Sequence, residues 1–146
     1  MIEYLNMSIF DSPAECLVNL INCEGAMGKG LALEFKKRYP TMFLQYQRDC
    51  MQKKMGIGML SLYTTSDIKI LNFPTKEYWR YPSRLIHIEY GLRTFNESYE
   101  FFGLRSISFP KLGCGLGGLD WKTQVQPLMV DFLSNLSIDV YIHLGK

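Results

Sequence analysis

The sequence predicts an α/β fold in which helices cover a mainly parallel β-sheet. Short apolar runs, typical of buried strands, alternate along the chain with stretches whose apolar residues recur every three or four positions, as in amphipathic helices. Two glycine-rich runs each follow one of the apolar runs and precede a helical stretch. Alternation of strands with helices is the pattern of parallel sheets joined by helical crossovers.

Six strands are expected, at residues 2–9, 14–22, 58–63, 69–73, 105–109 and 138–144. The second run is apolar almost throughout, so we expect it at the centre of the sheet. Four helices are expected, at residues 28–39, 41–53, 82–102 and 121–135. Pro40 separates the first two helices, because proline ends one helix and is favoured at the start of the next.

Composition favours one globular domain spanning residues 1–146, with 47% hydrophobic and 21% charged residues. No apolar run is long enough for a membrane span and the first residues lack the features of a signal peptide, so we expect a cytoplasmic protein without membrane contact. We also expect a monomer. The four scattered cysteines are expected to be reduced. With two histidines and no zinc-site spacing, neither a metal nor a cofactor is expected. The net charge of +2 is compatible with a phosphate-rich substrate but does not by itself indicate nucleic-acid binding.

The two glycine-rich runs predict a phosphate-binding site. They are residues 25–30 (Gly-Ala-Met-Gly-Lys-Gly) and 113–118 (Gly-Cys-Gly-Leu-Gly-Gly). Glycine lets the backbone turn sharply and point N–H groups at a ligand, and a following helix adds the positive end of its dipole. Both runs, like residues 72–76, fall at the carboxyl ends of expected strands, where such sheets bind ligands. Two loops in one domain predict a ligand with two phosphates held between them.

Neither run fits a common nucleotide-binding motif well. Gly28-Lys29 is followed by Gly30 instead of Ser or Thr, and the preceding glycine is too close for a P-loop. The second run has the Gly-x-Gly-x-x-Gly spacing of a dinucleotide site, but it lies late in the chain. The acidic residue that should end a strand about twenty positions on is missing, because Asp139 opens its strand.

Longer segments around these runs resemble the macrodomain family. They are residues 18–22 (Val-Asn-Leu-Ile-Asn), the first glycine run, and residues 112–121 (Leu-Gly-Cys-Gly-Leu-Gly-Gly-Leu-Asp-Trp). Residues 72–80 (Asn-Phe-Pro-Thr-Lys-Glu-Tyr-Trp-Arg) resemble the DarG branch in particular. The resemblance covers essentially the whole chain, and it implies a three-layer α/β/α sandwich around a mixed, mostly parallel six-stranded sheet that binds ADP-ribose.

DarG-type macrodomains remove ADP-ribose from DNA bases modified by a DarT-type toxin. The resemblance therefore implies an ADP-ribosyl glycohydrolase with the role of an antitoxin, acting on ADP-ribosylated single-stranded DNA, with a DarT-like toxin as a partner. Two alternatives stay open: hydrolysis of protein- or acyl-linked ADP-ribose, and a binding module without catalysis.

The resemblance also implies which residues act. Lys76 would be catalytic, which requires a lowered pKa that the neighbouring segment 78–80 could supply through an apolar wall and a cation. Asn22 would contact the distal ribose through its amide. Trp79, Arg80 and Arg84 are candidates for DNA contact, because bases stack on aromatic rings and arginine planes. The expected ADP-ribose contacts are Ser8, Ile9, Gly25, Ala26, Met27, Gly28, Lys29, Gly30, Leu31, Thr75, Gly113, Cys114, Gly115, Leu116, Gly117, Gly118 and Leu119.

Several positions depart from the family pattern or invite another interpretation. Gly117 replaces the acidic residue of the human-type lysine glycohydrolases, which disfavours cleavage of ester-linked ADP-ribose. Asp120 is expected to cap the next helix instead. Ser8 stands where many macrodomains bond adenine through aspartate, and a hydroxyl bonds more weakly. Cys114 is not expected to be a nucleophile, because no histidine lies near it in sequence. Asn19 is expected to be structural.

Overall fold

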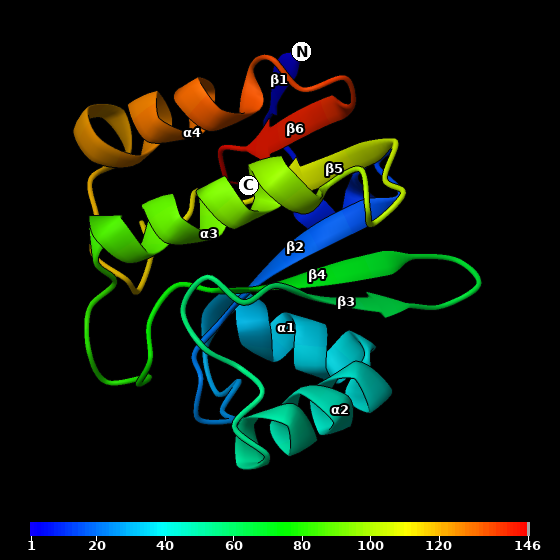
Figure 1. Ribbon diagram of the computed structural model, residues 1–146, viewed down its shortest axis with the longest axis vertical. Helices are drawn as coiled ribbons and strands as arrows, with labels where there is room; N and C mark the ends of the chain where they lie inside the picture. The colour runs from blue at the N-terminus through cyan, green and yellow to red at the C-terminus, as the bar shows by residue number, and fades with distance from the viewer. Residues whose placement is uncertain (146) are drawn as a thin grey trace.

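A computed structural model describes residues 1–145 and shows one sheet between two layers of helices (Figure 1). The strands are β1 (Ile2–Leu5), β2 (Cys16–Ile21), β3 (Ser61–Thr64), β4 (Lys69–Pro74), β5 (Ser106–Phe109) and β6 (Asp139–His143). Their order across the sheet is β1-β6-β5-β2-β4-β3. The β3–β4 pair is antiparallel and the other four pairs are parallel, which confirms the mixed, mostly parallel sheet.

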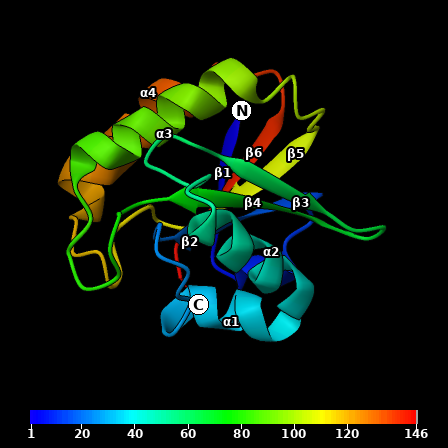
Figure 2. The same cartoon turned by 60° about the horizontal axis from the view of Figure 1, so that its bottom comes forward.

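The helices divide between the two faces of the sheet. Figure 2 shows α1 (Gly30–Arg38) and α2 (Pro40–Met51) on one face, with α3 (Leu85–Ser98) and α4 (Gln126–Leu133) on the other. Two short elements complete the fold, the 3-10 turn η1 (Ile9–Asp11) and the π-helical turn η2 (Trp121–Val125). The expected three-layer α/β/α sandwich is therefore confirmed.

The structure corrects several expected boundaries. The strand expected over residues 2–9 ends at Leu5, because Leu5 pairs with His143, where β6 itself ends. Ser8 then caps η1 by accepting a hydrogen bond from the backbone N–H of Phe10. The helix expected over residues 82–102 begins at Leu85, because Arg84 is still extended, and the helix expected over 121–135 opens with η2.

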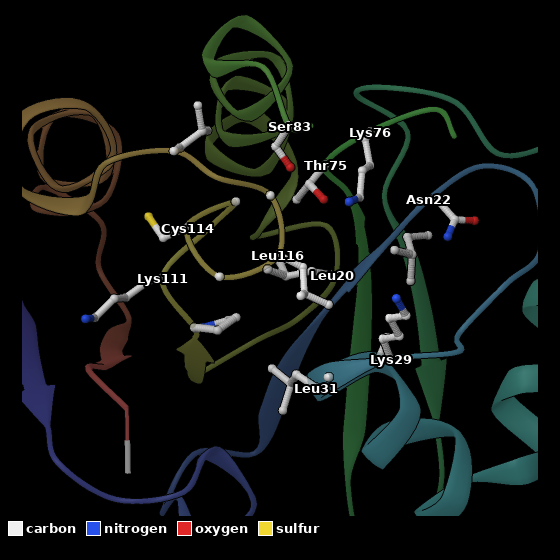
Figure 3. Close-up of a pocket in the computed structure, with 18 of the residues that line it drawn as sticks. Leu20, Asn22, Lys29, Leu31, Thr75, Lys76, Ser83, Lys111, Cys114 and Leu116 are labelled. Atoms are coloured by element: carbon white, nitrogen blue, oxygen red, sulfur yellow. The ribbon is translucent and has the colours of Figure 1, made fainter. Parts of the chain in front are cut away.

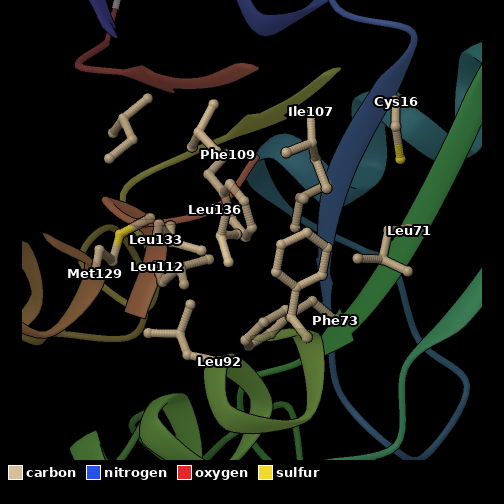
Figure 4. Close-up of a cluster of buried hydrophobic side chains, with 14 of the residues drawn as sticks. Cys16, Leu71, Phe73, Leu92, Ile107, Phe109, Leu112, Met129, Leu133 and Leu136 are labelled. Atoms are coloured by element: carbon tan, nitrogen blue, oxygen red, sulfur yellow. The ribbon is translucent and has the colours of Figure 1, made fainter. Parts of the chain in front are cut away.

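The core consists of two apolar clusters, one on each face of the sheet. On the α3 and α4 face, Phe73, Phe95 and Phe109 are fully buried, and Figure 4 shows part of this cluster. On the α1 and α2 face, Phe35 and Tyr46 belong to the second cluster. Strand β2 contributes alternate residues to both clusters, which is why it reads as a continuous apolar run and why its expected central position is confirmed.

Parallel packing brings the chain segments of interest to one edge of the sheet. The two glycine loops follow β2 and β5, and the segment that contains Lys76 follows β4, which lies beside β2. Within residues 1–145, no helix combines the length and the apolar character needed to cross a bilayer.

Candidate active site

A cleft of about 1030 Å³ opens at this edge of the sheet, between the two glycine loops (Figure 3). Most residues expected at the site line it: Asn22, Ala26, Met27, Gly28, Lys29, Gly30, Leu31, Thr75, Lys76, Trp79, Arg80, Gly113, Cys114, Gly115, Leu116, Gly117 and Leu119. The fold thus brings together segments that follow three different strands.

Other expected residues do not line the cleft. Ile9 is buried in the apolar cluster under α1 and α2, and the Ser8 hydroxyl oxygen accepts the hydrogen bond that caps η1. Gly25 and Gly118 have φ of 93° and 83°, so they serve the turns of their loops. Arg84 lies outside the cleft as well. Contact of Ser8, Ile9, Gly25 and Gly118 with ADP-ribose, and of Arg84 with DNA, stays a prediction.

Asn22 organises the first glycine loop through its side chain. Its Nδ2 donates to the Ala26 carbonyl (2.8 Å), and its Oδ1 accepts from the backbone N–H groups of Glu24 (3.1 Å) and Ala26 (3.4 Å). The buried hydroxyl of Tyr46 lies 2.7 Å from Oδ1 and 2.9 Å from the Asn22 carbonyl oxygen. An amide has two N–H donors, so one donor of Asn22 is left for a ligand.

Backbone hydrogen bonds place Lys76 next to this loop. The N–H of Thr75 donates to the Ile21 carbonyl (3.0 Å), and the N–H of Cys23 donates to the Glu77 carbonyl (3.0 Å). Lys76 therefore lies between two main-chain attachments to the end of β2. Figure 3 shows its amino group pointing into the cleft.

The environment of Lys76 suits a reactive amine. Its side chain is half-buried and, within residues 1–145, makes no ion pair and no hydrogen bond. Burial lowers the pKa of the Lys76 ammonium, because desolvation disfavours the charged form. The guanidinium of Arg80 lies 5.9 Å from the ring centre of Tyr78 and 5.5 Å from that of Tyr81, which holds it at the rim of the cleft.

The second glycine loop leaves no room for a side chain at Gly117. A Cβ atom there would lie 2.4 Å from the Gly113 carbonyl oxygen and 2.4 Å from Ser83 Oγ. The approach is close because the N–H of Ser83 donates to the Gly117 carbonyl (3.0 Å), which ties the loop to the chain before α3. An acidic residue at this position would force the loop to rearrange.

Positive charge dominates the cleft. Lys29, Lys76, Arg80 and Lys111 line it, against the single carboxylate of Asp120 among the lining residues. Backbone N–H groups of the glycine loops and the start of α1 at Gly30 add donors at the same place. The cleft is therefore built for an anionic ligand.

Comparisons with known proteins identify the family to which a chain with this fold and cleft belongs. A family model described as the macro domain matches residues 18–128. The chain belongs to the macro domain family. A curated relative from Mycobacterium tuberculosis, named DNA ADP-ribosyl glycohydrolase, is 39% identical over 98% of this chain and 42% of its own length. The chain spans about two fifths of the length of the curated glycohydrolase relatives that it matches.

Solved structures place this macro domain beside those of DarG. The macrodomain of Mycobacterium tuberculosis DarG is 38% identical, with a TM-score of 0.93 over 100% of this chain and 99% of that chain. Thermosipho africanus DarTG in complex with ADP-ribose is 36% identical, with a TM-score of 0.92 over 98% of this chain and 41% of that chain. The expected DarG-like branch of the family is confirmed.

Asp120 and Cys114 have structural roles in this macro domain. Asp120 caps η2 by accepting hydrogen bonds from the backbone and hydroxyl of Thr123, which lower the pKa of its carboxyl. The expected cap is confirmed. Burial raises the pKa of the Cys114 thiol, which donates to the Leu112 carbonyl (3.5 Å). This environment does not activate a nucleophile, in agreement with the expectation for Cys114.

Sequence reasoning missed several residues that line the cleft, among them Ser83, Lys111, Trp121 and His143. His143 forms a chain of hydrogen bonds below the cleft, with Nδ1–H donating to the Met7 carbonyl (3.1 Å) and Nε2 accepting from Ser108 (2.9 Å). Burial lowers the pKa of His143, which keeps the ring neutral. A lone histidine in a closing strand carries no motif, so no sequence signal identified it.

Proposed function

We propose that this macro domain is an ADP-ribosyl glycohydrolase that removes ADP-ribose from modified DNA bases. The observation that carries the proposal is Lys76, a half-buried lysine with a lowered pKa and no ionic partner in residues 1–145, inside a positively charged cleft. The similarity to proteins named DNA ADP-ribosyl glycohydrolase supports it.

The ligand would lie with its diphosphate between the two glycine loops. Loop N–H groups, the start of α1 and the ammonium of Lys29 supply the donors and charge that a diphosphate requires. A cleft of about 1030 Å³ is at the upper end of the usual size for small-molecule sites, as an extended dinucleotide-like ligand needs. The DarTG structure in complex with ADP-ribose supports this choice of ligand.

Asn22 and Lys76 would act on the distal ribose. The free N–H of Asn22 would orient a ribose hydroxyl, while the hydrogen bonds from Tyr46 and the first loop hold the amide in place. Lys76 would act at C1 of that ribose, as a nucleophile or as a stabilising group when the base departs. In the net reaction the bond from C1 to the base nitrogen breaks, water supplies the new oxygen at C1, and the base nitrogen takes a proton.

The proposed activity also implies a partner and a cellular location. Reversal of DNA ADP-ribosylation is the work of an antitoxin, so we infer a DarT-like toxin as the partner, in line with the DarTG similarity. We also infer that residues 1–146 function as a single monomeric domain in the cytoplasm. The four cysteines are all free, which is compatible with a reducing compartment. Trp79 and Arg80 lie at the rim, where single-stranded DNA would contact them.

The experiment that tests the proposal is substitution of Lys76. Lys76→Ala should reduce release of ADP-ribose from ADP-ribosylated single-stranded DNA by about 100-fold or more, in the range of lost acid–base or nucleophilic catalysis. Binding of free ADP-ribose, measured by calorimetry, should be retained. Activity of Lys76→Ala close to that of the wild-type chain would remove Lys76 from the mechanism.

The same assay compares the alternative substrates. The lack of space for a side chain at Gly117 excludes the acidic residue that would accompany Lys76 in cleavage of ester-linked ADP-ribose. We therefore expect release from modified DNA to exceed release from ADP-ribosylated protein. A wild-type chain that binds ADP-ribose and cleaves neither substrate would instead be a binding module.

A further inference from the structure

A second, smaller cavity lies beside the cleft. It has a volume of about 230 Å³ and is lined by Lys76, Glu77, Tyr81, Pro82, Arg84 and His87. Lys76 also lines the cleft, and it is the one lining residue that the two cavities have in common. Arg84 does not line the cleft, but it lines this second cavity.

The position of this cavity matches a part of the substrate that the cleft does not accommodate. If ADP-ribose occupies the cleft with C1 of its distal ribose at Lys76, the group bonded to C1 must project past Lys76. The second cavity begins at that point, since Lys76 is the residue that the two cavities share.

The walls suit a planar heterocycle. Tyr81 and Pro82 offer flat apolar surface, and Tyr81 is 53% exposed. The Tyr81 ring is held edge-on against Tyr78, with ring centres 5.6 Å apart, and lies under the Arg80 guanidinium. Stacking on such a ring is available to any base, because every base has a π-face.

The polar groups of the cavity have unused hydrogen-bonding capacity. Within residues 1–145, the Arg84 side chain has no ion pair, so its guanidinium N–H donors are available to a ligand. Glu77 adds an acceptor next to these donors. The edge of a nucleobase carries both carbonyl and N–H groups, so it can use donors and an acceptor together. A phosphate has only acceptors, so it would leave the Glu77 carboxylate unpaired.

The volume fits one part of a ligand. About 230 Å³ is roughly eight times the 30 Å³ that a water molecule occupies in the liquid. It is below the range of about 300–1,000 Å³ for sites that hold a whole small molecule. A single base would fill it, while the rest of the substrate lies in the cleft.

We infer that this second cavity is the subsite for the nucleobase that leaves when its bond to ADP-ribose breaks. The inference rests on the proposed function and assigns Tyr81 and Arg84 to recognition of the base. It separates two tasks on the two sides of Lys76, with ADP-ribose bound on one side and the departing base on the other.

The test uses two variants and two substrates. Tyr81→Leu removes the aromatic face, and Arg84→Gln removes the guanidinium. The substrates are an ADP-ribosylated single-stranded oligonucleotide and a single nucleoside that carries ADP-ribose on its base and has no phosphate of its own. Each variant should lose about tenfold or more in kcat/KM on both substrates and keep the wild-type Kd for free ADP-ribose.

Arg93 offers a matched control for Arg84. Arg93 is exposed on α3, where it pairs with Glu89 (3.0 Å), and belongs to neither cavity. Arg93→Gln should behave as the wild-type chain on both substrates, and thermal unfolding of all three variants checks that each is folded.

The outcomes separate the inference from the proposed function. A loss confined to the oligonucleotide would overturn the base subsite in favour of contacts to DNA phosphates or flanking bases. Unchanged kcat/KM in both variants would overturn the inference while the proposed function stands. A wild-type chain that releases no ADP-ribose from either substrate would overturn the proposed function, and the base subsite with it.

Discussion

The close packing around Gly117 predicts a sharp contrast between two glycines of one loop. In Gly117→Ala the new Cβ would lie 2.4 Å from the Gly113 carbonyl oxygen, which is backbone, and 2.4 Å from Ser83 Oγ. Overpacking of this kind costs about 1–3 kcal/mol, because the neighbours cannot move without breaking the Ser83–Gly117 hydrogen bond. We therefore expect Gly117→Ala to lower the free energy of unfolding by about 2 kcal/mol, or Tm by about 4–8 °C.

Gly115→Ala is the matched control. Nothing lies within 4 Å of a Cβ at Gly115, and its φ is not positive, so this variant should unfold within about 1 kcal/mol of the wild-type chain. Thermal and denaturant unfolding measure both variants, and calorimetry with ADP-ribose reports whether the loop still binds. Equal stability and equal affinity in the two variants would refute the argument that the loop excludes a side chain at position 117.

Three further predictions follow from buried polar groups. Tyr46→Phe should cost about 1–2 kcal/mol of unfolding free energy and weaken ADP-ribose binding, because the Tyr46 hydroxyl holds Asn22. The control Tyr63→Phe, which removes a half-buried hydroxyl without a hydrogen bond in residues 1–145, should do neither. If the neutral amine of Lys76 acts, single-turnover hydrolysis should rise with pH and level off below the ordinary lysine value of 10.5, and a flat profile would argue against an amine nucleophile. Since the pKa of His143 is lowered in the fold, the unfolded chain binds the extra proton first, so stability should fall as pH drops through and below 6.5; His143→Gln should reduce this slope, and an unchanged slope would contradict the neutral ring.

The fold was predictable from sequence because its elements carry strong local patterns. Strand β2 reads as a nearly continuous apolar run since both of its faces are buried, and α3 shows its buried stripe at helical spacing. The ends were less predictable. Strand β1 stops where its partner β6 stops, which depends on pairing with residues more than 130 positions away.

The residues of the candidate site also fall into two groups, those that a sequence motif identifies and those that only the tertiary structure brings together. The glycine loops and Lys76 lie in contiguous motifs, so they could be identified before the structure. His143 could not, because its partners Met7 and Ser108 lie 136 and 35 positions away in sequence. The second cavity also depends on tertiary structure, since it combines the segment after β4 with the first turn of α3.

The attachment of Lys76 by main-chain hydrogen bonds has a consequence for how such a site can change over evolutionary time. The bonds from Thr75 to Ile21 and from Cys23 to Glu77 use no side chains, so any residue except proline at the two donor positions can form them. The exposed residues between Glu77 and Pro82 can therefore accept substitutions while the reactive amine keeps its place. Substitutions in this short segment alone, by natural selection or by design, could change which leaving group the domain accepts.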